Sequence, residues 1–172
     1  MNDNPPPIPS EAAQPMFFPV SLLKLVVMST VTFGIYELYW FYRNWKLIKQ
    51  RTSRDIMPFW RAFFAFFFCY SFFKEVKDSA ASRSVVVGFS PGLLAVAWIG
   101  VTLCWRLPDP YWLVDTLAVL ALLPVQKVVN EVNASFAPNH APNVRFSGWN
   151  IAGIVFGGLL LVLAIIGTFL PE

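Results

Sequence analysis

The stretch Thr32-Phe-Gly-Ile-Tyr-Glu-Leu-Tyr-Trp-Phe-Tyr-Arg-Asn-Trp-Lys46 decides the expected fold of this chain. An apolar segment ends within it, and a basic segment begins there. Seven of its residues are aromatic. Tyr and Trp favour the boundary between hydrocarbon and water, because the ring is apolar while its O–H or N–H stays hydrated. The stretch therefore predicts the point at which a membrane helix reaches the membrane surface.

The composition around this stretch agrees with a membrane location. Of the 172 residues, 56% are hydrophobic and 13% are charged, whereas a soluble domain carries about 25% charged residues. A soluble fold of this length could not hide so much apolar surface. We expect an all-α, polytopic transmembrane helical bundle of four to five helices. Residues 19–172 would form this single domain, after a disordered Pro-rich tail at 1–18.

Apolar runs place the expected helices at about residues 19–45, 58–80, 92–107, 111–133 and 149–170. The last run has 22 uncharged residues and is long enough to cross a bilayer. The uncharged core of the second run is too short for this, so we expect it to be a re-entrant or interfacial helix. A full crossing of the second run is the alternative.

Charge indicates which side is cytoplasmic. The loop at residues 43–57 has one acid, Asp55, against five basic residues, namely Arg43, Lys46, Lys49, Arg51 and Arg54. Loops rich in Lys and Arg stay in the cytoplasm. We therefore expect this loop inside, bound to anionic lipid headgroups, and the N-terminus outside. Four crossings would leave the C-terminus outside, and five would leave it inside.

Four charged residues are candidates for intramembrane polar pairs. Glu37 lies in the apolar aromatic stretch, and Arg61 on the next segment is its expected partner. Arg106 and Asp115 flank a tight turn and are expected to pair across it. Ionisable groups in a membrane are costly and often mark ion pathways. A structural pair is the favoured interpretation of both, and an ion or substrate role is the alternative.

The last expected helix contains a Gly-x-x-x-Gly pattern at Gly153 and Gly157. Small residues let helix backbones approach closely, and we expect packing within the monomer rather than dimerisation. His140 is the only histidine, and no pattern typical of a metal, cofactor or catalytic site is present. The sequence thus predicts no enzyme, no metal, no cofactor and no nucleic-acid partner.

One family resemblance rests on Thr32, Gly34, Ile35, the Tyr39–Trp45 run and Pro58-Phe-Trp-Arg61. This pattern resembles a family of small bacterial inner-membrane proteins that contain a domain of unknown function. The likeness covers roughly residues 19–75 and extends more loosely to 143–150. It implies a multi-pass protein of the bacterial inner (cytoplasmic) membrane. It implies no activity and assigns no functional residue.

Two classes of function remain open from the sequence. The first is a non-enzymatic structural, sensing or accessory membrane module, whose partner would be another membrane protein or a second copy of this chain. The second is a small transporter or channel subunit that uses Glu37 and Arg61. Because most charges lie near segment ends rather than inside the membrane, the first class is favoured.

Overall fold

The computed structural model describes residues 14–170, and every regular element in that range is a helix. The predicted all-α class is therefore confirmed. The α-helices are α1 (Leu22–Val31), α2 (Ile35–Thr52), α3 (Pro58–Phe63), α4 (Ala65–Ala81), α5 (Pro91–Thr102), α6 (Val119–Phe136) and α7 (Gly148–Phe169). The 3₁₀ helices η1 (Leu103–Arg106) and η2 (Tyr111–Leu117) join α5 to α6.

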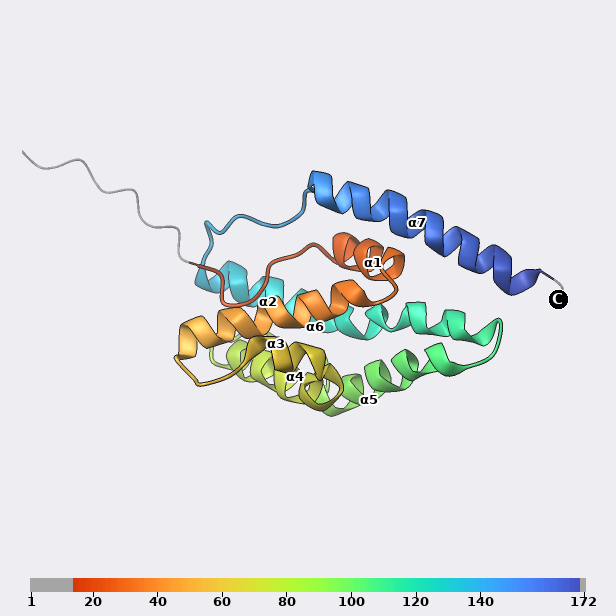
Figure 1. Cartoon of the computed structure of the whole chain (residues 1–172). Coiled ribbons are helices and arrows are strands. Elements are labelled where there is room, and N and C mark those ends of the chain that lie inside the picture. The colour runs from red at the N-terminus through yellow and green to blue at the C-terminus, as the bar shows by residue number, and fades with distance from the viewer. Residues whose placement is uncertain (1–13, 171–172) are drawn as a thin grey trace, which may run out of the picture.

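The helices form an elongated bundle (Figure 1). α7 packs on α1, α1 packs on α2 and α6, and α4 and α5 pack on α6. The C-terminal ends of α2, α4 and α6 gather at one end of the bundle. The η1–η2 turn and the end of α7 lie toward the opposite end.

The helix expected at 19–45 is broken into α1 and α2 by a reversal at residues 32–34. Phe33 and Gly34 have φ values of 49° and 79°, in the left-handed region that a helix cannot continue through. The Gly34 N–H donates to the Ser29 carbonyl at 2.9 Å and closes α1. The Thr32 hydroxyl donates to the Met28 carbonyl at 2.7 Å and accepts from the Tyr36 N–H at 3.0 Å, so it joins the two helices. The chain therefore turns back after ten helical residues instead of running straight through.

The other expected helices keep their places with local breaks. Residues 58–80 become α3 and α4, which separate at Phe64, where the backbone leaves helical geometry (ψ 42°). The last turn of the helix expected at 92–107 is the 3₁₀ helix η1, and the first turns of the helix expected at 111–133 are the 3₁₀ helix η2.

The aromatic stretch forms the core of the bundle rather than only a band at its surface. Trp40, Phe41 and Trp45 are all almost fully buried. The Trp40 ring lies 5.1 Å from that of Phe72 on α4, and the Phe41 ring lies 5.2 Å from that of Trp98 on α5. The buried positions of α2 follow helical spacing, so one face of the stretch packs inward. The expectation that the whole stretch lies at a membrane surface is therefore wrong for its buried face, which packs inside the protein.

The segment 16–20 is non-helical and largely buried, which corrects the expected disorder for residues 16–18. The part of the expected tail at 1–13 lies outside the described residues. Phe17 and Phe18 are both buried. A non-helical segment in the interior needs hydrogen-bond partners for its peptide groups.

Side-chain amides supply these partners, and we call this set the amide clamp (Asn44, Gln126, Asn130 and Asn133). Asn133 accepts from the Phe17 N–H at 3.0 Å and donates to the Phe17 carbonyl at 2.9 Å. Asn44 accepts from the Phe18 N–H at 2.9 Å. Gln126 and Asn130 donate to the Val20 carbonyl at 3.2 and 3.0 Å. The amide clamp therefore supplies hydrogen bonds to the peptide groups of this non-helical segment, which has no strand to pair with in the described part of the chain.

α7 meets α1 where Gly157 lies against Val31. A Cβ at Gly157 would overlap the Val31 carbonyl oxygen, whereas a Cβ at Gly153 would only touch the Met28 methyl group at 3.8 Å. Gly157 is also the one buried residue of α7. The two glycines therefore support packing within the monomer, with Gly157 as the point of closest approach.

Candidate functional site

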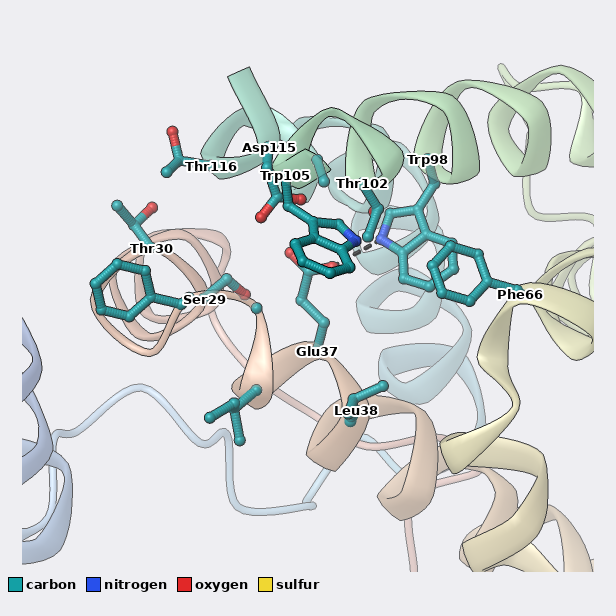
Figure 2. Close-up of a pocket in the computed structure, with 14 residues that line it drawn as sticks. Ser29, Thr30, Glu37, Leu38, Phe66, Trp98, Thr102, Trp105, Asp115 and Thr116 are labelled. Atoms are coloured by element: carbon teal, nitrogen blue, oxygen red, sulfur yellow. Dashed lines mark hydrogen bonds between the residues drawn. The ribbon is translucent and has the colours of Figure 1, made fainter. Parts of the chain in front are cut away.

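The candidate site is a cavity of about 210 Å³ at the tip of the α1–α2 reversal, and Figure 2 shows its lining. α1 and α2 supply one wall, and α5, η1 and η2 supply the opposite wall. Phe33 and Gly34, at the break between α1 and α2, both line this cavity.

Glu37 is the central charged residue of the cavity. It lies in the first turn of α2, and only 5% of its surface is exposed. Its Oε2 accepts a hydrogen bond of 2.7 Å from the Trp98 indole N–H on α5. The reversal at Gly34 points this first turn toward α5, η1 and η2 (Figure 2). Glu37 is therefore held in place by one neutral donor and carries no ion pair within residues 14–170.

A second carboxylate, Asp115 on η2, lines the same cavity. Figure 2 shows Asp115 and Trp105 on the wall toward which the Glu37 side chain extends. The short η1–η2 connection folds η2 back beside α5 and brings Asp115 there. The two carboxylates were identified in the sequence as members of separate pairs, and the structure brings them together.

Four hydroxyl residues also line the cavity, namely Ser29, Thr30, Thr102 and Thr116, and two of them are buried without a partner in residues 14–170. Ser29 Oγ and Thr102 Oγ1 are buried and have no hydrogen-bond partner. Ser29 is 2% exposed. Most buried polar groups in proteins are hydrogen-bonded, so an unpaired hydroxyl at a cavity wall points to a water or ligand there.

The predicted Glu37–Arg61 pair does not form. Arg61 lies on α3, and its guanidinium stacks over the rings of Trp45 and Phe68 at 4.5 and 5.2 Å. Glu37 is in the first turn of α2 and Trp45 is more than two turns further on, so the two charges lie at different levels of the bundle. Arg61 therefore takes no part in the cavity.

The predicted Arg106–Asp115 pair also does not form. Arg106 is exposed and lies over the neighbouring Trp105 ring, at 5.1 Å. Asp115 is turned into the cavity instead. Within residues 14–170, the ion pairs are those of Arg51 and Arg54 with Glu75 on α4, at 3.5 and 2.8 Å.

The expected basic loop at 43–57 is mostly helix, because α2 continues to Thr52, and its basic residues are partly occupied by protein contacts. Arg51 also donates to the Met16 carbonyl at 2.8 Å, and burial lowers the pKa of its guanidinium while Glu75 opposes that shift. Arg43 stacks over Phe18 at 5.0 Å. Lys46 and Lys49 are exposed on α2. The basic residues at 43–54 are therefore not equally available to lipid headgroups.

Trp98, Ser29 and Thr102 were not singled out from the sequence. A partner for Trp98 could have been expected from the sequence. A buried indole N–H needs an acceptor, and the apolar segment around Trp98 offers no side-chain acceptor. The small hydroxyl residues carried no such signal. In the part of the chain that the structure describes, no group of three or more His, Cys, Asp or Glu residues could hold a metal ion.

Comparison with known proteins gives no further assignment. No protein-family model, no curated protein and no solved structure matches this chain. The resemblance at residues 19–75 therefore stays a prediction, and the function has to be argued from the geometry above.

Proposed function

We propose that this chain is a multi-pass protein of the bacterial inner membrane that acts as a non-enzymatic structural, sensing or accessory module. α7 is the observation that carries the proposal. It has 22 residues. Over an 18-residue stretch of this helix the mean hydropathy is 2.5, and only 6% of that stretch is buried against the rest of the protein. The whole helix would extend about 33 Å, enough to cross a bilayer. Lipid would cover the apolar face that the protein leaves open.

Two further elements support a membrane location. Tyr111–Phe136, which contains η2 and α6, is the second helical stretch long and apolar enough to cross. Four rings of α3 and its junction with α4 are exposed and contact one another, namely Phe59, Trp60, Phe63 and Phe64. Exposed aromatic rings of this kind suit the headgroup boundary. α3 and α4 would then form the re-entrant or interfacial element.

The positions of the charges suggest an orientation. Arg106 lies at the η1–η2 turn, whereas Lys46, Lys49 and Arg51 lie in the C-terminal half of α2, which ends at the opposite end of the bundle. The positive-inside rule would place that basic end in the cytoplasm. The expected partners there are anionic headgroups at Lys46, Lys49 and Arg43.

The same geometry favours a position for the first described residues that differs from the sequence expectation. Because Arg51 Nη1 is 2.8 Å from the Met16 carbonyl, residue 16 and the basic loop lie at the same end of the bundle. α1 spans about 15 Å, half of the hydrocarbon thickness. In this arrangement α1–α2 and α3–α4 are hairpins that enter and return. α5–η1, η2–α6 and α7 are the crossings, and the C-terminus is outside.

Thiol labelling tests this orientation. We expect Q14C, D55C and S82C, each in a background without Cys69 and Cys104, to react with an impermeant maleimide only after the cytoplasmic face is opened. L170C should react in intact cells with a permeabilised outer membrane. Labelling of Q14C in intact cells while D55C stays protected would contradict the hairpin arrangement.

The cavity favours a second candidate, a small transporter or channel subunit. Glu37 and Asp115 meet at its wall, so the pathway would use this pair and not Arg61. The cavity lies where a broken helix meets the bundle, as binding sites of many transporters do.

We expect Glu37→Gln to reduce a cation flux in proteoliposomes at least tenfold while expression stays normal, because the variant removes a buried carboxylate from the pathway. Glu131→Gln on α6, an exposed carboxylate outside this cavity, is the matched control. Wild-type flux no greater than that of empty liposomes would exclude transport and leave the accessory module as the proposal.

A further inference from the structure

The cavity has a polar wall and an apolar rim. The polar wall contains Glu37, Asp115 and four hydroxyl residues, of which Ser29 and Thr102 are buried without a hydrogen-bond partner among the described residues. Five apolar or aromatic side chains of the rim are each more than a third exposed, namely Phe33, Ile35, Leu38, Phe66 and Trp105. The apolar rim fits the proposed membrane location, in which the opening would face the lipid tails. A ligand that enters from there needs an apolar part as well as a polar group.

The charge of the wall indicates the sign of the ligand. Two carboxylates line the cavity, and no Lys, Arg or His lines it. Two like charges in one poorly hydrated cavity repel each other and lose hydration. A cation between them would relieve both costs. The unpartnered Ser29 and Thr102 hydroxyls add acceptor oxygens on the same wall.

The surrounding rings distinguish an organic cation from a metal ion. Mg²⁺ and Ca²⁺ take six or more oxygen ligands, whereas here indole rings of Trp98 and Trp105 occupy much of the lining. An ammonium group has three N–H donors and is attracted to aromatic faces. The volume of about 210 Å³ exceeds that of a cavity of roughly 150 Å³ known to admit benzene.

We propose that this cavity binds a primary ammonium ion that carries one small apolar group, such as an aromatic ring. The ammonium group donates hydrogen bonds to Glu37, Asp115 and Ser29. The apolar group lies among the rings of the rim. The proposal rests on the membrane location only for the route of entry, since binding itself is measured in detergent.

Benzylammonium is the probe, titrated into purified full-length protein in detergent at pH 8 and followed by calorimetry. Benzyl alcohol, a neutral molecule of the same shape, measures partition into micelles and apolar contacts. We expect saturable binding of benzylammonium at millimolar or lower concentration and at least tenfold weaker binding of benzyl alcohol. This difference reflects hydrogen bonds to charged groups.

Variants then locate the site. Glu37→Gln and Asp115→Asn should each weaken benzylammonium binding about tenfold or more, and Ser29→Ala should weaken it several-fold. Glu131→Gln should leave it unchanged. If the Glu37→Gln variant aggregates, the binding of benzylammonium by Asp115→Asn tests the proposal. The Asp115 side chain makes no hydrogen bond within residues 14–170, so this change should not disturb the fold.

Three results would overturn the proposal: no saturable binding at 10 mM, equal binding of benzyl alcohol, or full binding by Asp115→Asn and Ser29→Ala. The first would mean that the cavity holds only water or a proton. Binding without flux in liposomes would support the site and exclude transport. Thiol labelling reports on the membrane topology independently of both.

Discussion

Gln126→Leu is expected to lower the melting temperature of the purified protein by roughly 10 °C. Gln126 is fully buried on α6. Its Oε1 accepts from the Trp40 indole N–H at 2.6 Å, and its Nε2 donates to the Phe18 carbonyl at 3.3 Å. Leu has nearly the same volume, so the core stays filled. The Trp40 indole N–H and the Phe18 carbonyl then lose their hydrogen bonds, whereas the Val20 carbonyl keeps the one from Asn130.

Each buried group left without a partner costs about 1–3 kcal/mol. Two such groups, at about 2–4 °C per kcal/mol for a chain of this size, give the expected shift. The measurement is thermal unfolding in detergent, followed by tryptophan fluorescence. Gln50→Leu, the same change at an exposed position of α2, should move the midpoint by no more than about 2 °C. A similarly small shift for Gln126→Leu would show that the clamp contributes little to stability.

Gly157→Ala and Gly158→Ala are expected to have opposite effects, although they are adjacent and chemically identical changes. At Gly157 the new methyl group overlaps the Val31 carbonyl oxygen, which belongs to the last turn of α1 and cannot rotate away. At Gly158 nothing lies within 4 Å of a Cβ. Alanine there should favour the helix by up to about 1 kcal/mol.

Overpacking of this kind costs about 1–3 kcal/mol, so Gly157→Ala should lower the melting temperature by roughly 5 °C. Gly158→Ala should leave it unchanged or raise it slightly. α7 packs mainly on α1, so hydrogen exchange in Gly157→Ala should increase in α1 and α7 and stay unchanged in α4. Equal melting temperatures for the two variants would contradict the close approach at Val31.

The positions of the helices could be predicted from the sequence, whereas the break between α1 and α2 could not. A glycine within an apolar periodic run is compatible with a continuous helix, so Gly34 alone does not announce a reversal. The break depends on Phe33, a non-glycine residue in the left-handed region. Hydrogen bonds of Thr32 and Gly34 close the break, and neither residue type alone indicates one in a sequence.

The two carboxylates of the candidate site were predicted from the sequence, but their partners were not. Glu37 and Asp115 stood out because carboxylates are rare in apolar segments. Their expected partners were Arg61 on the next segment and Arg106 across the turn. Each of these arginines stacks on an aromatic ring instead. A guanidinium can be satisfied by ring faces as well as by carboxylates, and a chain with 17 Phe and 7 Trp offers many such faces.

The amide clamp also sets an order of events during biosynthesis. The hydrogen bonds from Asn133 to Phe17 join residues 116 positions apart, and those from Gln126 to Phe18 join residues 108 apart. The ribosome makes residues 16–20 early and α6 much later. Residues 16–20 therefore lack these hydrogen-bond partners until more than a hundred further residues have been synthesised. The first part of the described chain to be made is among the last to be fixed in place.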